Sequence, residues 1–185
     1  VIPTSWQKAD AVITDSSAIQ NELIPRMDSP NTIFPIHLGV DPNRFHPTPN
    51  ESDRQIRTQH GLTNPFYLFV GTREPRKNLE TLRQAYHRAG ERGLMSDLVI
   101  VGRQGWMDQH RTAHSKIRWL GHVADSDLPA LYRGARAVVA PSLYEGFDLP
   151  PVEALACGTP IIASDIPVHR EILRDSTRFV ACQDV

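Results

Sequence analysis

The sequence predicts an α/β domain built on a doubly wound, Rossmann-like parallel sheet. Short apolar runs recur along the chain at residues 67–70, 98–101, 117–120, 137–140, 160–163 and 178–181. Most of these runs are continuous rather than alternating, which is typical of strands that are buried on both faces. Segments with helical periodicity separate several of the runs, so strand and helix alternate as in βαβ units.

Two of the intervening segments carry a clear helical pattern. The first has apolar residues at helical spacing, namely Leu79, Leu82, Tyr86 and Ala89. The second, residues 128–135, repeats apolar residues at i, i+3, i+4 and i+7 and follows Asp125 and Ser126, which are candidates for its N-cap. We read Asp125 and Asp127 as N-cap and first-turn residues rather than as ligands of a metal ion.

The first quarter of the chain has a different pattern. Residues 11–14 (AVIT) predict one strand, and residues 15–24 predict a capped helix. Prolines are frequent between residues 25 and 49, which indicates a semi-rigid connector. We therefore expect residues 1–47 to be the tail of a preceding N-terminal domain with an interdomain linker. Residues 48–185 would be the sheet domain, truncated at its C-terminus.

Composition indicates an ordinary soluble globular protein. The chain has 185 residues, 20 basic and 21 acidic side chains, and a formal net charge of -1. Because the two signs are interspersed, neither nucleic acid nor an anionic membrane is expected as the main partner. No apolar run approaches the roughly 18 residues of a membrane helix. Cys157 and Cys182 lie in apolar contexts, so we expect reduced core thiols and a cytoplasmic location.

Ligands of open α/β sheets bind at the carboxyl ends of the strands, so the loops there are candidate sites. The loop after the first run, GTREPRKN (71–78), places Arg73, Arg76 and Lys77 directly before a helix. Fixed cations at a helix start predict a site for a polyanion such as a diphosphate, because they oppose the helix dipole unless an anion is present. Solvated surface cations are the alternative. The loop matches neither GxGxxG nor GxxxxGK[ST], which disfavours nicotinamide and P-loop chemistry.

A second loop, PSLYEGFD (141–148), precedes a helix that we expect to begin near Pro151. Glu153 would then lie near the third helical position, where an acid complements the helix dipole. Alternatively, Glu145 and Glu153 both face the ligand crevice and accept hydrogen bonds from sugar hydroxyls. The spacing of the two acids alone leaves both interpretations open.

The histidines give little indication of a metal site or of a role in ligand binding. His110 and His114 are four residues apart on a predicted helix, but no clear third ligand accompanies them, so a metal site is not expected. His169 and Glu171 follow a strand, and we favour a surface role for His169 over an approach to the crevice.

Taken together, VGTREPRKN and PSLYEGFDLPPVEALACGTPIIASDIPVHREI closely resemble the donor-binding, C-terminal half of retaining GT-B glycosyltransferases of the family-four group. The resemblance covers residues 64–182. IFPIHLGVDPNRFHP (33–47) is similar to the linker that enters this half from the acceptor-binding domain. The paired glutamates in this setting are a hallmark of the family.

The resemblance implies a site for a nucleotide-diphosphate sugar. Arg76 and Lys77 would hold the diphosphate and act with Glu145 in catalysis, Glu145 binding hydroxyls of the donor sugar. Glu153 would bind the ribose hydroxyls. The remaining donor-binding positions would be Gly71, Thr72, Arg73, Val123, Gly146, Phe147, Asp148 and Leu149. Three features depart from the family pattern: Arg73 stands one residue beyond a common arginine, Asp148 replaces a small residue, and HLG (37–39) replaces the more usual Asn-Gly.

The implied activity is that of a retaining hexosyltransferase that transfers a sugar, mannose in our interpretation, to a polysaccharide or glycoconjugate. We expect no metal cofactor. A glycan or lipid-linked acceptor would bind through the missing N-terminal domain, which would also make any peripheral membrane contact, and the isolated chain should be inactive. The alternatives are a non-catalytic nucleotide-sugar-binding module of the same fold and a nucleotide-sugar epimerase.

Overall fold

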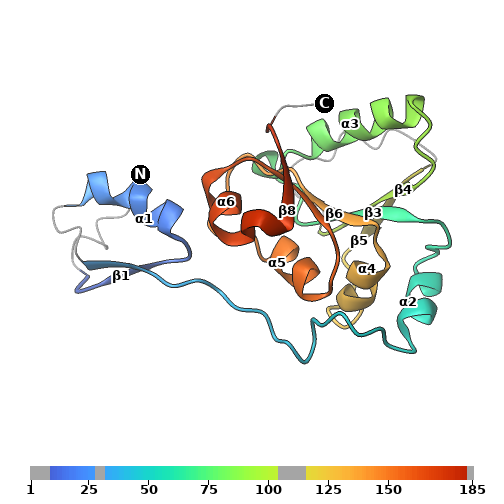
Figure 1. The fold of residues 1–185 in the computed structure, drawn as a ribbon, viewed down its shortest axis with the longest axis horizontal. Coiled ribbons are helices and arrows are strands. Elements are labelled where there is room, and N and C mark those ends of the chain that lie inside the picture. The colour runs from blue at the N-terminus through green and yellow to red at the C-terminus, as the bar shows by residue number, and fades with distance from the viewer. Residues whose placement is uncertain (1–8, 28–31, 104–115, 183–185) are drawn as a thin grey trace.

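Six parallel strands form the main sheet in the computed structural model of the chain, which describes residues 9–27, 32–103 and 116–182 (Figure 1). The strands are β3 (Phe66–Val70), β4 (Asp97–Val101), β5 (Ile117–Gly121), β6 (Ala137–Ala140), β7 (Ile161–Ser164) and β8 (Thr177–Val180). Their order is β5-β4-β3-β6-β7-β8. Each strand coincides with a predicted apolar run, which confirms the doubly wound sheet, and its switch point lies between β3 and β6.

The continuous apolar runs are explained by burial on both faces of this sheet. In β4, Leu98 and Ile100 pack in one hydrophobic cluster with residues of α3 (Leu79–Glu91). Val99 and Val101 point the opposite way, into a second cluster that contains Leu131 of α4 (Leu128–Gly134). Successive residues of a strand face opposite sides of the sheet. A strand that is buried on both faces can therefore be apolar at every position.

Helices cover both faces of the sheet, with α3 on one side and α4 and α5 on the other (Figure 1). The remaining helical elements are α1 (Ser17–Leu23), η2 (Ile24–Arg26), α2 (Asp53–Gln59), η4 (Pro75–Lys77), α5 (Leu149–Ala156), α6 (Pro167–Leu173) and η5 (Arg174–Ser176). The sequence analysis missed α2 because this helix has no apolar stripe. It is attached to α4 by a buried, bidentate pair in which Arg133 donates to both oxygens of Asp53.

The starts of two helices differ from the predicted positions. The N-cap residue of α4 is Asp127 rather than Asp125 or Ser126, and its side chain makes no capping hydrogen bond. Helix α5 begins at Leu149, two residues before the predicted start, because Asp148 adopts a left-handed conformation (φ 72°) that turns the chain directly into the helix. Glu153 is therefore the fifth residue of α5, and the prediction that it lies in the first turn was wrong.

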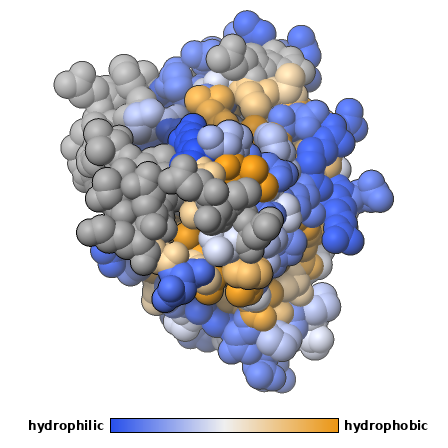
Figure 2. All heavy atoms as spheres, turned by 90° about the vertical axis from the view of Figure 1, so that its left-hand side faces the viewer, coloured by the Kyte–Doolittle hydropathy of each residue, from blue (hydrophilic) through white to orange (hydrophobic). Residues whose placement is uncertain are grey.

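The N-terminal residues form a separate small unit. The predicted strand and helix are present as β1 (Val12–Thr14) and α1, and Ser16 caps α1 by accepting from the backbone N–H of Ile19. A second strand, β2 (Ile33–Pro35), pairs in parallel with β1, which the proline-rich pattern did not indicate. The side chains of the paired residues Ile13 and Phe34 are 66% and 51% exposed. Figure 2 views this end of the molecule, where hydrophobic surface is visible between polar side chains.

The two cysteines are free thiols, as predicted. Cys157 lies in the core, whereas Cys182 is only half-buried. Among the helices that the structure describes, none combines the length and the apolar character that crossing a membrane requires.

Candidate active site

The loops after β3 and β6 meet at the switch point of the sheet. The backbone N–H of Leu143 donates to the carbonyl of Arg76 at 2.7 Å, which joins the two loops directly. Gly71 begins the first loop and packs against Gly102 at the end of β4, where a Cβ atom would lie 1.9 Å from the Gly71 oxygen. Only glycine fits this approach, so Gly102 determines the path of the cation-bearing loop.

Glu145 is the centre of this site. It is 5% exposed, and Lys77 Nζ lies 2.7 Å from its Oε1 oxygen. Arg76 Nη1 donates to the other oxygen, Oε2, and the Ser142 hydroxyl donates to Oε1 at 2.8 Å. The structure thus brings together the three residues for which catalytic roles were predicted. Arg76 is also paired with Glu74, at 2.8 Å from Nε.

Asp148 joins Lys77 to a histidine. One oxygen of its carboxylate lies 2.8 Å from Lys77 Nζ, and the other lies 3.0 Å from His169 Nε2. Burial raises the pKa of Asp148, but the hydrogen bond from His169 and the interactions with Lys77 together hold this pKa below its ordinary value. Burial lowers the pKa of Lys77, and Asp148 and Glu145 outweigh that effect and raise it. Asp148 and Lys77 are therefore both charged when the site is empty.

A cavity of about 380 Å³ opens above these side chains. Its lining residues are Asp15, Leu38, Arg76, Lys77, Tyr144, Glu145, Gly146, Phe147, Asp148, Leu149 and Pro150. Of the predicted donor-binding residues, the cavity thus contains Gly146, Phe147, Asp148 and Leu149. Three acidic and two basic side chains around one cavity can bind a ligand that carries both phosphate and hydroxyl groups.

Glu153 lies outside this cavity. Its Oε2 oxygen accepts from the hydroxyl of Tyr132 at 2.7 Å, and burial raises the pKa of Glu153. Its position in the second turn of α5 also weakens the helix-dipole interpretation, because the dipole acts mainly within the first turn. The two glutamates therefore occupy different environments, one with two cations and the other with a buried phenol.

Four other predicted positions do not line the cavity: Gly71, which begins the first loop, and Thr72, Arg73 and Val123. The guanidinium of Arg73 stacks on Trp119 of β5 at 4.8 Å from the ring centroid, and Arg73 is 9% exposed. Thr72 donates to Glu74 at 2.7 Å. Val123 is buried in the core cluster that includes α4. The predicted use of Arg73 as a phosphate ligand has no support in this geometry.

The expectation of a surface role for His169 was wrong, because this residue is fully buried. Glu171, one turn away, accepts from the backbone N–H groups of Ser17 and Ala18 at 2.8 Å each, at the start of α1. It also lies 2.6 Å from His37 Nε2. The apolar spacing of Val168 and Leu173, both buried, was the only sign in the sequence that α6 packs inward.

The N-terminal unit forms one wall of the site. Ser16 Oγ donates to the Gly146 carbonyl at 2.7 Å, and the Tyr144 hydroxyl donates to Glu22 at 3.0 Å. These contacts join α1 to the loop that carries Glu145. They also place Asp15 at the rim of the cavity.

Among the described residues, no group of three or more histidine, cysteine, aspartate or glutamate side chains lies close enough together to bind a metal ion. His110 and His114 lie outside the described residues.

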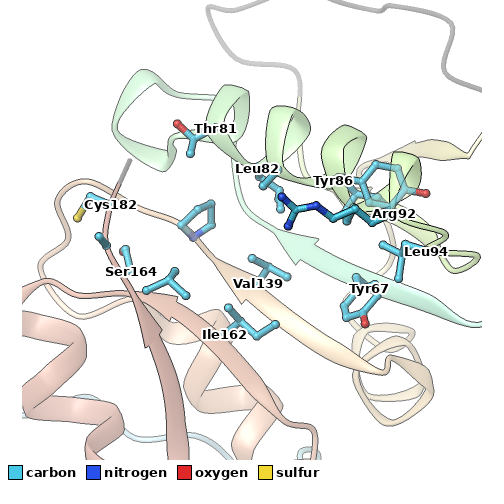
Figure 3. A pocket seen from close by; sticks show the side chains of 16 residues that line it. Tyr67, Thr81, Leu82, Tyr86, Arg92, Leu94, Val139, Ile162, Ser164 and Cys182 are labelled. Atoms are coloured by element: carbon cyan, nitrogen blue, oxygen red, sulfur yellow. The ribbon is translucent and has the colours of Figure 1, made fainter. Parts of the chain in front are cut away.

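A larger apolar cavity of about 480 Å³ lies on the α3 side of the sheet (Figure 3). Tyr67, Val139 and Ile162 form its floor, Leu82 and Tyr86 of α3 form one wall, and β8 and Cys182 form another. Arg92 is the one charged side chain among the described residues of its lining, so this cavity lacks the paired acids and bases of the cavity above Glu145.

Comparison with known proteins agrees with this geometry. Residues 52–183 match the family model described as "Glycosyl transferases group 1". The chain is 33% identical over 190 residues to O-antigen chain mannosyltransferase B of Escherichia coli, an alignment that covers 98% of the chain and 50% of that protein. It is also 33% identical over 156 residues to O-antigen chain mannosyltransferase RfbU of Salmonella typhimurium, covering 79% of the chain and 42% of that protein.

Solved structures show the same fold. Sucrose-phosphate synthase from Thermosynechococcus elongatus aligns with a TM-score of 0.79 and 27% identity over 96% of the chain and 47% of that protein. Anabaena HepE in complex with UDP-glucose aligns with a TM-score of 0.81 and 21% identity over 95% of the chain and 51% of that protein. The chain spans about half the length of the relatives that it matches.

Proposed function

Because the chain belongs to the glycosyl transferases group 1 family, we propose that it is the donor-binding part of a retaining glycosyltransferase. The protein would transfer a hexose from a nucleotide-diphosphate sugar to a glycan acceptor. Mannose is the proposed sugar, because relatives that align over most of the chain are named mannosyltransferases.

One observation carries this proposal. Arg76 and Lys77 bind opposite oxygens of Glu145 at the carboxyl ends of the strands, directly beside the switch point and under an open cavity. The switch point is where open α/β sheets bind nucleotides. A site with two fixed cations and a carboxylate matches the two chemical parts of a sugar diphosphate.

Arg76 and Lys77 are proposed to bind the diphosphate. Cleavage of the bond between the anomeric carbon and the diphosphate leaves negative charge on the phosphate oxygens and an oxocarbenium-like sugar. Cations positioned at the diphosphate stabilise that developing charge and lower the barrier. Arg76 is 41% exposed in its side chain, which leaves it free to turn from Glu145 and Glu74 toward an entering phosphate.

Glu145 is proposed to accept hydrogen bonds from the donor sugar hydroxyls. When the diphosphate takes over the two cations, the carboxylate of Glu145 gains the capacity to accept from other donors. Backbone amides of Gly146, Phe147 and Leu149 in the cavity lining, with that of Thr72 in the loop after β3, would complete the donor contacts. The amide of Gly71 already donates to the Val101 carbonyl at 2.9 Å, so Gly71 would contribute through its lack of a side chain.

The nucleoside would bind toward Glu153 and Val123. Tyr132 holds Oε2 of Glu153, whereas Oε1 has no hydrogen-bond partner among the described residues. That free oxygen suits a ribose hydroxyl. The loop backbone at Val123 would contact the base, since its side chain is buried in the core.

Retention of configuration is proposed to follow from attack on the same face from which the diphosphate departs. The leaving phosphate would accept the proton of the acceptor hydroxyl, so the protein supplies no nucleophile. Glu145 and Glu153, held in separate environments, do not form the acid and nucleophile pair of a retaining glycosidase. We propose that no metal is required, because Arg76 and Lys77 supply positive charge at the diphosphate.

The acceptor would bind to parts of the full-length protein outside this chain, since the chain spans about half of its relatives. The exposed apolar residues of β1 and β2, among them Ile13 and Phe34, would pack against the remainder of an N-terminal domain. The isolated chain would then bind the donor but transfer little sugar, because water is not excluded from an open site.

Calorimetric titration of the chain with GDP-, UDP- and dTDP-sugars tests the proposal. We expect binding of a mannose donor, with GDP-mannose the first to examine, and competition by the corresponding nucleoside diphosphate. Incubation of the full-length protein with the same donor and an acceptor glycan should release nucleoside diphosphate and extend the glycan by one sugar. The proposal fails if no nucleotide sugar in the panel binds.

A further inference from the structure

A buried chain of polar groups behind Lys77 has no part in the proposed function. His169, in α6, is fully buried, and Asp148 is 7% exposed. His169 Nε2 lies 3.0 Å from Asp148 Oδ2, and Lys77 Nζ donates to the other oxygen of that carboxylate at 2.8 Å. Asp148 therefore links the histidine to one of the two cations of the site.

The surroundings of the imidazole require a proton on Nδ1. The carbonyl oxygen of Ser164, which can only accept, lies 2.9 Å from this nitrogen. The Ser164 hydroxyl lies 3.2 Å away and donates its own proton to the carbonyl of Ser142, so it too presents a lone pair to the ring. Nδ1 is therefore a hydrogen-bond donor.

Nε2 requires a proton as well. It faces Asp148; burial raises the pKa of this carboxyl, but its interactions with His169 and Lys77 hold the pKa below its ordinary value, so Asp148 is ionised. A carboxylate can only accept, so the hydrogen bond to the ring must be donated by Nε2. A ring that donates from both nitrogens is an imidazolium and carries a positive charge.

The charged groups near the ring are few. Asp148 contacts it directly, and Lys77 and Glu145 follow one and two hydrogen bonds further on. Neighbours on α6 bond elsewhere: Arg170 to Asp165, and Glu171 to the backbone of Ser17 and Ala18. On the β7 side, the ring contacts Ser164, which carries no charge.

We propose that His169 is a positioning residue, held as an imidazolium, that fixes Lys77 through Asp148 and balances the charge of the donor site. The buried residues Lys77 and His169 then offset Glu145 and Asp148, whereas a neutral His169 would leave this group with a net charge of -1. Such a group would repel a diphosphate. The inference rests on the proposed function for the identity of the ligand, though not for the state of the histidine.

The sign of the pH dependence follows. The imidazolium of His169 favours donor binding, whereas loss of its proton would leave negative charge uncompensated and weaken binding. A change of one charge close to the site is expected to change the affinity by roughly tenfold.

Titration of GDP-mannose between about pH 6 and about pH 8.5, the range in which histidines change charge, measures this effect. Its diphosphate is esterified at both ends and does not titrate there. We expect the Kd to rise roughly tenfold with pH in the unmodified chain. His169→Gln should bind more weakly at low pH and lose the pH dependence. The control is His60→Gln, since His60 forms a similar pair with Asp127, 2.9 Å apart and away from the cavity, and it should keep the original profile.

A profile for His169→Gln that matches the unmodified chain would overturn the inference. Absence of binding at every pH would refute the proposed function instead. The state of the ring can be tested in the unmodified chain without any ligand, because ¹⁵N chemical shifts report the protonation of each imidazole nitrogen and through-bond correlation with the backbone identifies the signals of His169. Two protonated nitrogens at about pH 6 support the inference, and a neutral ring at that pH refutes it even if the variant does not fold.

Discussion

Replacement of Lys77 by alanine is the most direct test of the donor site. Lys77 Nζ bridges Glu145 and Asp148 at 2.7 and 2.8 Å, and its side chain is 9% exposed. A hydrogen bond to a charged group contributes about 1.5 to 3 kcal/mol. Loss of the contact to the diphosphate should therefore weaken binding by about tenfold to about a hundredfold.

The same change leaves two buried acids without a shared cation, which should also lower stability. Breaking a buried pair by removing one partner costs about 3 to 5 kcal/mol. Lys77→Met keeps most of the side-chain volume, so it separates the loss of charge from the loss of packing. Lys116→Ala is the matched control, because its ammonium contacts only the exposed Met95 sulfur among the described residues, at 3.8 Å.

Calorimetry with nucleoside diphosphate measures the affinity, and thermal unfolding monitored by circular dichroism shows whether each variant is folded. We expect both Lys77 variants to bind at least tenfold more weakly and Lys116→Ala to bind normally. An unchanged Kd in a folded Lys77 variant would remove this residue from the site. Equal weakening in the Lys116 control would show that the effect is not local.

Three further substitutions test other parts of the site and the fold. Glu145→Gln should weaken nucleotide-sugar binding about tenfold relative to that of the nucleoside diphosphate, since only the sugar hydroxyls donate to the carboxylate; equal changes in calorimetry would contradict that role. Glu153→Ala should weaken GDP about tenfold and 2′-deoxy-GDP less, and equal losses would exclude a ribose contact. The hydrogen bond from Arg133 lowers the pKa of Asp53 in the folded protein. The pair therefore stabilises the fold fully at pH values above the ordinary pKa of an aspartate. This stabilisation is lost as the pH falls through the lowered pKa of the folded state. Asp53→Asn should therefore flatten the acid limb of urea-denaturation stability, and an unaltered limb would refute this.

The sequence by itself determined the sheet and the position of the site within it. Continuous apolar runs identify strands that are covered on both faces, and parallel strands place their carboxyl ends at one edge. Loops that follow two strands adjacent at the switch point must therefore meet. Arg76, Lys77 and Glu145, separated by about seventy residues, were assigned to one site by the family resemblance, and the observed order of the strands explains why their loops lie together.

The tertiary structure decided which partner each polar side chain has. Arg73 stacks on Trp119, Glu153 binds Tyr132, and His169 is buried against Asp148. A local pattern reports which face of its own element a residue occupies, whereas a hydrogen-bond partner depends on how distant elements pack. Strand β2 and helix α2 were missed for the same reason, because neither has a periodic apolar pattern of its own. Strand β2 is held by pairing with β1, and α2 is held by an ion pair with α4. Local sequence encodes the elements, and only the packed fold brings together the charges that they carry.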